Sequence, residues 1–314
     1  MSRYCLLELL LLLAVFSLSA CGDSSPAIPS GEFSTLSYNV AGLPQEVSQE
    51  NPKDHIPLIS PLINEYDIVV TQEDFDWWQP ALDALDFANY HTRLRAQTDF
   101  PYQSERHPGP EAVGLDWEAD RPTLMVGDGL GLLSRFPFDE FRRIPWGSCA
   151  TAAADCLAMK GFAMARVELE PGFKVDVYTL HAEAGGEADD NEARALGFDQ
   201  LAVYIQTNSE GHAIILGGDT NLHTEPESDD TDNREDARVW REFLQRTDLS
   251  DVCEFLQCAD NTRIDKFAFR GVSTLTLEPL SWQFLADTFV DAAGEPLSDH
   301  EPLLVEWRWT GPEG

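Results

Sequence analysis

Short runs of apolar residues alternate along the chain with longer segments in which apolar residues recur every three or four positions. The short runs predict β-strands at residues 33–40, 67–71, 131–136, 162–169, 175–180, 213–216 and 302–309. The longer spacing predicts helices at residues 54–65, 78–85, 191–207 and 234–244. Strands and helices therefore alternate without an internal repeat, which is typical of a layered α/β domain.

The first segment of the chain has the features of a bacterial export signal. An apolar run at residues 6–18 follows Arg3 and is too short for a comfortable membrane span. It ends in Leu-Ser-Ala-Cys-Gly, which resembles a lipobox with lipid attached to Cys21. The alternative is an ordinary secretory signal with a cysteine near its cleavage site.

The lipobox interpretation divides the chain into three parts. We expect residues 1–20 to be a lipoprotein signal peptide, residues 21–32 a flexible polar tether, and residues 33–310 the folded domain. Several acyl chains on Cys21 would anchor the protein stably, because one chain alone binds only marginally. The protein would then be exported and held in the bacterial envelope, at the outer membrane or its periplasmic face, or released from it.

Composition and charge narrow the class of protein. The 314 residues are 43% hydrophobic and 24% charged, which suits one large or two small globular domains and excludes a disordered, collagenous or coiled-coil chain. The formal net charge is −34, and loss of the first twenty residues leaves it unchanged. An acidic chain repels polyanions at long range, so we expect no stable nucleic-acid complex, although a metal-dependent nuclease stays possible.

The cysteines fit an exported protein, because disulfides persist in oxidising compartments. Without the cysteine in the signal and the acylated Cys21, four cysteines remain, and four allow three pairings. We favour the two local pairs, Cys149–Cys156 and Cys253–Cys258, which close short loops and would act as structural staples.

Five short blocks each put polar residues directly after an apolar, strand-like stretch. The blocks are Ser-Tyr-Asn-Val (37–40), Thr-Gln-Glu (71–73), Thr-Leu-His (179–181), Gly-Gly-Asp-Thr-Asn (217–221) and Ser-Asp-His (298–300). In a layered α/β fold such strand ends converge on one edge. Carboxylates, amides and two histidines gathered there would suit a hard divalent cation and a phosphate ester. Because Mg²⁺ needs few protein oxygens, Glu73 alone or with Asp299 could bind it.

Each block alone is common by chance, but all five in this order are a specific combination. The chain resembles the endonuclease/exonuclease/phosphatase superfamily, the metal-dependent phosphoesterases of the deoxyribonuclease type. The resemblance extends over residues 33–309, essentially the whole expected domain. It implies a four-layer α/β/β/α sandwich with two packed mixed sheets.

The resemblance implies roles for residues on the metal side of the site. Glu73 matches the Mg²⁺ ligand, and Asn39 matches the asparagine beside the metal. Asp299 is the acidic, metal-side neighbour of the expected base. Mn²⁺ or Ca²⁺ could replace Mg²⁺. Arg135, in the block Gly-Leu-Leu-Ser-Arg-Phe-Pro, matches a segment that mainly shapes the site.

The resemblance also implies the catalytic groups. His300 matches the general base, and Asp265 matches the carboxylate that orients it. Asp219 and Asn221 match the pair that orients the nucleophile and the transition-state oxygens. His181 matches the histidine that contacts the phosphate or assists the leaving group. A carboxylate partner of this kind raises a histidine pKa and fixes its tautomer.

Three further segments resemble the neutral sphingomyelinase branch of the superfamily. They are LSYNVAGLP (36–44), TLHAEAG (179–185) and DCLAMKG (155–161), which fits a DxxxxKG block. In that block Lys160 could meet the phosphate or pair with Asp155. One feature departs from secreted bacterial sphingomyelinases, because residues 267–289 contain Trp282 but no paired aromatic tip for entering a membrane.

The sequence therefore predicts a Mg²⁺-dependent phosphoric ester hydrolase that cleaves a phosphodiester by attack of water. The favoured substrate is a lipid headgroup, as for a sphingomyelinase or another phospholipase C-like enzyme, and we expect a monomer. One alternative is an extracellular nuclease or small phosphodiesterase. The other is a non-catalytic binding lipoprotein of the envelope.

Overall fold

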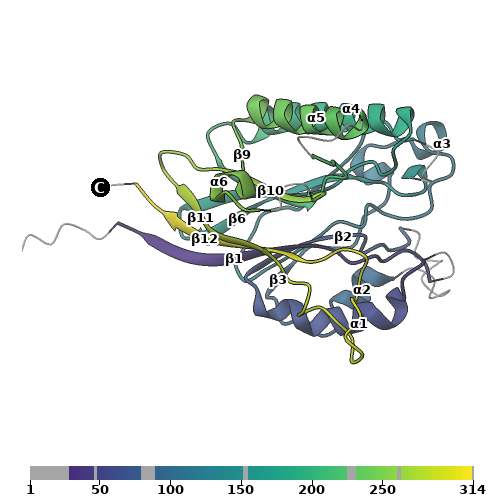
Figure 1. Cartoon of the computed structure of the whole chain (residues 1–314), viewed down its shortest axis with the longest axis horizontal. Helices are drawn as coiled ribbons and strands as arrows, with labels where there is room; N and C mark the ends of the chain where they lie inside the picture. The colour runs from purple at the N-terminus through teal and green to yellow at the C-terminus, as the bar shows by residue number, and fades with distance from the viewer. Residues whose placement is uncertain are drawn as a thin grey trace, which may run out of the picture.

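A computed structural model describes residues 28–45, 48–78, 89–150, 155–224, 231–259 and 263–312 as two stacked six-stranded mixed sheets with helices on the outer faces (Figure 1). In the first sheet the strand order is β11 (Thr276–Phe284), β12 (Leu303–Thr310), β1 (Ser30–Asn39), β2 (Ile68–Gln72), β4 (Gly131–Ser134) and β3 (Tyr102–Gln103). In the second it is β5 (Arg142–Pro145), β6 (Gly161–Glu170), β7 (Phe173–His181), β8 (Ala213–Asp219), β10 (Asp265–Arg270) and β9 (Ser250–Asp251).

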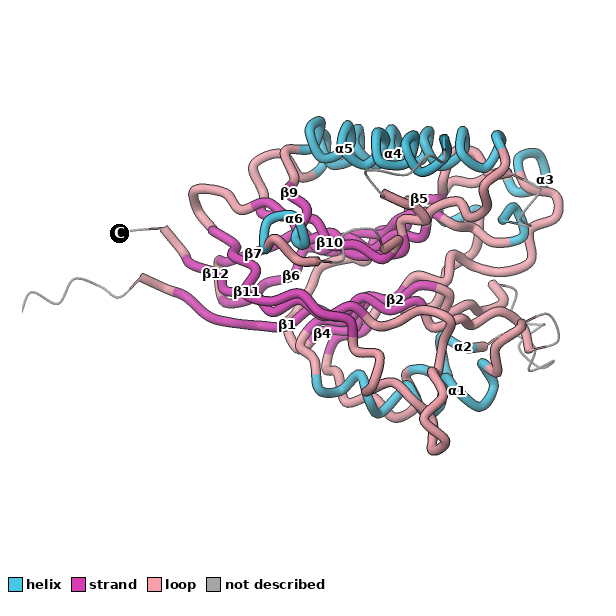
Figure 2. Tube along the Cα trace, viewed as in Figure 1, coloured by secondary structure: helices cyan, strands magenta, loops and turns pink. Residues whose placement is uncertain are grey.

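Helices cover both outer faces of the stacked sheets, as Figure 2 shows. One outer face carries α1 (Pro52–Leu62) and α2 (Tyr90–Leu94), and the other carries α4 (Ala188–Asn208) and α5 (Thr231–Thr247). The shorter elements are α3 (Trp117–Asp120), α6 (Val252–Leu256) and the 3₁₀ turns Ile63–Glu65, Glu111–Val113 and Asp155–Leu157. The arrangement confirms the expected α/β/β/α sandwich. No helix in the described part of the chain is long and apolar enough to cross a membrane.

The core between the sheets is centred on Trp307 of β12, which is fully buried. Its ring stacks on Phe33 of the same sheet at 6.5 Å between ring centroids. It also meets two rings from β10 in the facing sheet, Phe267 at 6.4 Å and Phe269 at 5.4 Å. The two sheets are therefore joined by one aromatic cluster, in which edge-to-face pairs add to the gain from apolar burial.

The strand register brings polar residues from both sheets to one edge. In the first sheet β1 and β2 run parallel, with Asn39 opposite Gln72. In the second, β7 and β8 run parallel, with His181 opposite Asp219. Strand β10 is antiparallel to β8 and begins with Asp265 opposite Asp219. The carboxyl ends of four strands and the start of a fifth therefore meet at this edge.

A buried hydrogen bond joins the two sheets close to the same edge. The side-chain amide of Gln72 on β2 donates to Oγ1 of Thr179 on β7 at 3.0 Å. Both side chains are buried, Gln72 completely. Because a buried donor without a partner is costly, this bond fixes how the two sheet edges lie against each other.

The expected strands are all present, but their ends and number differ from the prediction. Strand β1 begins at Ser30, three residues early, because residues 30–32 pair with the end of β12. Five strands were not predicted: β3, β5, β9, β10 and β11. Strand β11 contains Pro279 and a bulge before Ser281, which the edge of a sheet tolerates. Strand β10 begins with charged Asp265 and Lys266. The apolar residues after them are therefore too few to form a recognisable strand pattern in the sequence.

Several predictions concern segments near or beyond the described residues. The signal peptide, Cys21 and most of the tether lie outside them. Trp78, the start of an expected helix, lies in a bend, and residues 79–88 are not described. Both expected disulfides, Cys149–Cys156 and Cys253–Cys258, are present.

The aromatic cluster between the sheets predicts a large effect of removing its central ring. Replacing Trp307 by alanine would leave a cavity between the two sheets. It should therefore lower the free energy of unfolding by about 3–5 kcal/mol. Urea denaturation followed by circular dichroism measures it. Leu196→Ala is the control, because the Leu196 side chain is 49% exposed. Equal stability of the two variants would contradict the central role of Trp307.

Candidate active site

The amide of Asn39 lies at the centre of the polar edge and is fully buried. Its Nδ2 donates to Glu73 Oε1 at 3.0 Å and to Asp219 Oδ2 at 3.1 Å. Its Oδ1 accepts a hydrogen bond from the backbone N–H of Ala41 at 3.0 Å, which fixes the orientation of the amide. In this orientation Asn39 holds the two carboxylates together through its Nδ2. Its part beside the metal stays a prediction.

Glu73 follows β2 on a turn that needs an unusual backbone. Its φ of 58° is in the left-handed region, which non-glycine residues seldom adopt. Two glycines make room for this turn. A β-carbon on Gly42 would lie 2.1 Å from the Glu73 carbonyl oxygen, and one on Gly129 would lie 2.9 Å from the Glu73 Cα. The side chain stays 18% exposed, so its carboxylate can reach a ligand.

His181 and Asp219 lie side by side at the ends of β7 and β8. The Nε2 of His181 is 3.4 Å from Asp219 Oδ2 and 3.8 Å from Glu73 Oε1. Burial lowers the pKa of His181 well below its ordinary value, so the ring is neutral at pH 7. Burial raises the pKa of Asp219 to about 6, although the charge of His300 opposes the shift. Asp219 Oδ1 accepts from the backbone N–H of Asn221 at 3.0 Å.

His300 and Asp265 form a hydrogen-bonded pair across the same edge. The Nδ1 of His300 is 2.7 Å from Asp265 Oδ2, and its Nε2 is 3.8 Å from Asp219 Oδ2. Burial lowers the pKa of His300, but the carboxylates of Asp265, Asp219 and Asp299 outweigh it and raise the pKa to about 10. The loop that carries Ser298 and His300 is held against β1, because Ser298 Oγ donates to the Asn39 carbonyl oxygen at 2.8 Å.

Lys160 contributes a buried positive charge beside this group. Its Nζ lies 2.5 Å from Asp155 Oδ1 and donates to the carbonyl oxygen of Ala182 at 3.4 Å. Of the two roles considered for Lys160, the structure shows the pairing with Asp155. Its charge also reaches the site. Burial is the main cause of the raised pKa of Glu73, and the charge of Lys160 is the strongest influence opposing it.

The structure brings together Asn39, Glu73, His181, Asp219, Asn221, Asp265 and His300, with Lys160 and Asp155 behind them. Asp299 lies exposed on the rim, with its Oδ1 3.3 Å from Ser298 Oγ. Its part as a metal ligand stays a prediction. Sequence reasoning missed Gly42 and Gly129, whose only signal is the need for close backbone approach.

Arg135 is not part of this group, so its predicted place beside the site is wrong. Strand β4 is antiparallel to β2 and pairs Ser134 with Ile68, at the end of β2 away from Glu73. The guanidinium of Arg135 pairs with Asp99 at 2.7 Å and donates to the carbonyl oxygen of Asn64 at 2.6 Å. It therefore stabilises the opposite edge of the sheet.

The acidic oxygens at the centre fit a hard divalent cation. Glu73 offers a partly exposed carboxylate whose pKa is raised by burial. Burial disfavours its charged form, and a nearby cation would stabilise that form. No group of three or more Asp, Glu, His or Cys in the described ranges has an arrangement that could hold a metal. Mg²⁺ is commonly bound through one or two carboxylates together with water and substrate phosphates, so Glu73, with Asp219 beside it, fits that mode.

A comparison with protein families agrees with this geometry. Residues 36–300 match the Endonuclease/Exonuclease/phosphatase family. The chain belongs to that family.

The chain is also similar to individual sphingomyelinases, in sequence to one and in fold to another. The chain is 32% identical over 304 residues to a sphingomyelinase of Mycobacterium tuberculosis, covering 92% of this chain and 55% of the relative. It therefore spans about half the length of that protein. Sphingomyelinase C of Streptomyces griseocarneus has a TM-score of 0.57 at 17% identity, with 88% of this chain and 99% of that chain covered.

A further solved structure, a beta toxin variant of Staphylococcus aureus with bound magnesium ions, has a TM-score of 0.55 at 16% identity, with 88% and 99% of the two chains covered. At such low identities the two solved structures show that the fold is shared.

The pairing of His300 with Asp265 predicts a selective change of the His300 pKa. In metal-free protein, Asp265→Asn should lower that pKa by about one unit or more, because the adjacent negative charge is lost. An NMR pH titration of the imidazole signals measures it. Asp299→Asn should lower the pKa less, because Asp299 influences His300 less than Asp265 does. Equal shifts in the two variants would contradict the assignment.

Proposed function

We propose that this protein is a Mg²⁺-dependent phosphodiesterase that hydrolyses the headgroup phosphodiester of a choline lipid, as a sphingomyelinase does. The observation that carries the proposal is the position of His300. It is held by Asp265 at 2.7 Å, with Nε2 3.8 Å from the Asp219 carboxylate that Asn39 contacts. Family membership and the 32% identity to a sphingomyelinase support the same reaction.

The residues of the chain divide the work of hydrolysis. In its neutral form, His300 donates Nδ1–H to Asp265, which leaves Nε2 free to take a proton from water. Asp219 lies near the Nε2 atoms of both histidines and helps to orient that water. When bound beside Glu73, Mg²⁺ would neutralise charge on the non-bridging phosphate oxygens and lower the His300 pKa toward neutral pH.

The remaining groups stabilise the leaving alcohol and the transition state. His181 is neutral because burial lowers its pKa, so it can donate one N–H to a phosphate or alcohol oxygen. Asn221 sits next to Asp219, and its Nδ2 donates to the Ala182 carbonyl oxygen at 3.2 Å. Attack of water on phosphorus then releases the lipid alcohol and phosphocholine.

A panel of substrates tests this proposal. With Mg²⁺, the purified protein should release phosphocholine from sphingomyelin vesicles, and a chelator should abolish the reaction. His300→Gln should lower the rate about 10²- to 10⁴-fold, because it removes the base. Arg135→Gln is the control and should keep the rate, because Arg135 lies at the opposite sheet edge.

Other outcomes of the panel identify other functions. Nicking of plasmid DNA or cleavage of bis-p-nitrophenyl phosphate without phosphocholine release would replace the lipid substrate by a nucleic acid or a small diester. Inactivity on sphingomyelin, phosphatidylcholine, DNA and the small diester together would favour a binding lipoprotein.

We also propose that lipid on Cys21 anchors the protein in the bacterial envelope, on the basis of the lipobox-like sequence before it. Radiolabelled palmitate should enter the wild-type protein and not a Cys21→Ser variant, because lipid attachment needs the Cys21 sulfur. Cell fractionation of the two proteins should then show membrane attachment only for the first. Equal labelling of both would contradict lipidation at Cys21.

A further inference from the structure

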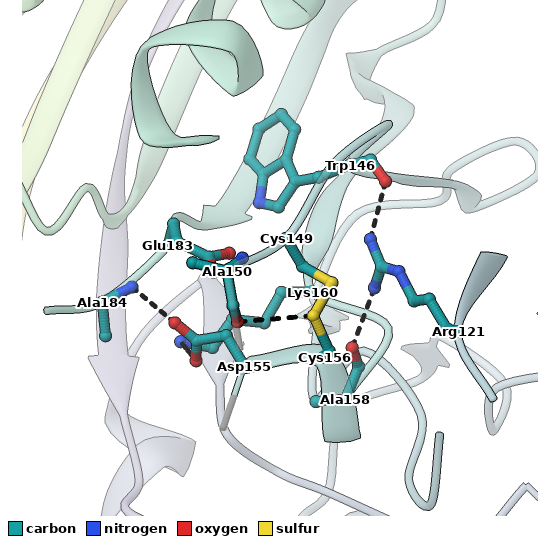
Figure 3. The surroundings of a disulfide bond; sticks show 10 residues. All are labelled: Arg121, Trp146, Cys149, Ala150, Asp155, Cys156, Ala158, Lys160, Glu183 and Ala184. Atoms are coloured by element: carbon teal, nitrogen blue, oxygen red, sulfur yellow. Dashed lines mark hydrogen bonds and ion pairs between the residues drawn. A yellow bond between two sulfur atoms is a disulfide. The ribbon is translucent and has the colours of Figure 1, made fainter. Parts of the chain in front are cut away.

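Residues 181–184, which begin with His181 at the end of β7, are hydrogen-bonded to the region around the Cys149–Cys156 disulfide. Figure 3 shows Glu183 and Ala184 of this segment beside that region. We refer to these four residues as the His181 segment. Each of them makes a hydrogen bond to this region. The bonds are Trp146 Nε1 to the His181 oxygen at 2.8 Å, Lys160 Nζ to the Ala182 oxygen at 3.4 Å, Ala150 N to Glu183 Oε1, and Ala184 N to Asp155 Oδ2 at 2.7 Å.

The disulfide holds the two flanks of this region together. Cys149 is bonded to Cys156, and the neighbours of these cysteines, Ala150 and Asp155, are two of the four groups that contact the His181 segment. Buried Arg121 adds a second link, because it donates to the carbonyl oxygens of Trp146 at 2.7 Å and Ala158 at 2.9 Å. We call the disulfide with Trp146, Ala150, Asp155 and Lys160 the disulfide clamp.

Buried charges couple the clamp tightly to the segment. The side chains of Asp155 and Lys160 are each 7% exposed, and Glu183 is 1% exposed. A buried charge that loses its partner is strongly destabilised, because the interior does not solvate it. Residues 182–184 exchange hydrogen bonds with the clamp, so a shift of the clamp would also move these residues.

The disulfide clamp is linked by hydrogen bonds to some of the proposed catalytic groups and not to others. The Ala182 carbonyl oxygen accepts from Lys160 and also from Asn221 Nδ2, so the clamp bears on both His181 and Asn221. His300 is held by Asp265 and by the loop around Ser298 instead. A loosened clamp should thus disturb one side of the site and leave the base in place.

We infer that the Cys149–Cys156 disulfide positions His181 and Asn221 for catalysis, and that its reduction by a dithiol switches hydrolysis off. The inference rests on the proposed phosphodiesterase function. In the switch, a thiolate of the dithiol attacks one cysteine sulfur and displaces the other as thiolate. The second thiol of the reagent then closes its own disulfide and leaves both cysteines reduced.

The second disulfide of the chain provides a matched control. Cys253–Cys258 closes a loop of similar length at α6, and neither of its cysteines contacts the His181 segment in the described structure. We compare the double variants Cys149→Ser/Cys156→Ser and Cys253→Ser/Cys258→Ser in the full chain. The first should lower kcat about 10- to 100-fold with KM little changed, because small displacements of catalytic groups cost this much. The second should keep the wild-type kcat.

Reduction provides a reversible version of the same test. Dithiothreitol should lower the kcat of the Cys253→Ser/Cys258→Ser variant to that of the Cys149→Ser/Cys156→Ser variant, and reoxidation should restore it. The reagent should have no further effect on the Cys149→Ser/Cys156→Ser variant. An unchanged kcat in that variant, or an equal loss in both double variants, would overturn the inference.

A spectroscopic measurement separates this inference from the proposed function. In ¹H–¹⁵N spectra of the histidine rings, loss of Cys149–Cys156 should shift or broaden the signals of His181 and leave those of His300 in place. Equal perturbation of both rings would show general loosening and overturn the positioning role. If wild-type protein hydrolyses none of the substrates, the proposed function fails, and the spectra still decide whether the disulfide positions His181.

Discussion

The two hydrogen bonds donated by the Asn39 amide connect carboxylates that belong to different sheets. Glu73 follows β2 of the first sheet, and Asp219 ends β8 of the second. The site therefore exists only if the sandwich closes with the right offset between its layers. The aromatic cluster around Trp307 and the hydrogen bond from Gln72 to Thr179 set that offset. The geometry of the site therefore depends on the packing of the core.

Environment gives the two histidines opposite properties. His181 is enclosed and its pKa falls, whereas His300 faces three carboxylates and its pKa rises to about 10. Both rings nevertheless approach the same oxygen of Asp219. The two rings are therefore suited to different tasks in the proposed reaction: His300 takes a proton from water once a bound cation lowers its pKa, and neutral His181 donates a hydrogen bond to a phosphate or alcohol oxygen.

Much of the site could be predicted because its residues are short blocks at strand ends. Parallel pairing of β1 with β2 and of β7 with β8 brings those blocks together. The error over Arg135 arose from strand direction, because β4 returns antiparallel and carries its last residue to the far edge. The hydrogen bonds of Trp146 and Glu183 gave no sequence signal, since they depend on loops that meet only after folding. Strand β10 was not predicted for a local reason, its charged first residues, although the motif placed Asp265 beside His300, where the structure has it.

The path of β1 determines how the domain faces its surroundings. The strand begins at Ser30, paired with Thr310 near the other chain end, and reaches the site at Asn39. Its ten residues span about 33 Å at the usual rise per strand residue, and Figure 1 shows the start of β1 and the end of β12 on the same side of the domain. The described chain therefore enters the domain at the end of β1 that is farthest from Asn39 and the catalytic edge. An attachment made before Ser30 would join the domain far from this edge and would leave the edge uncovered.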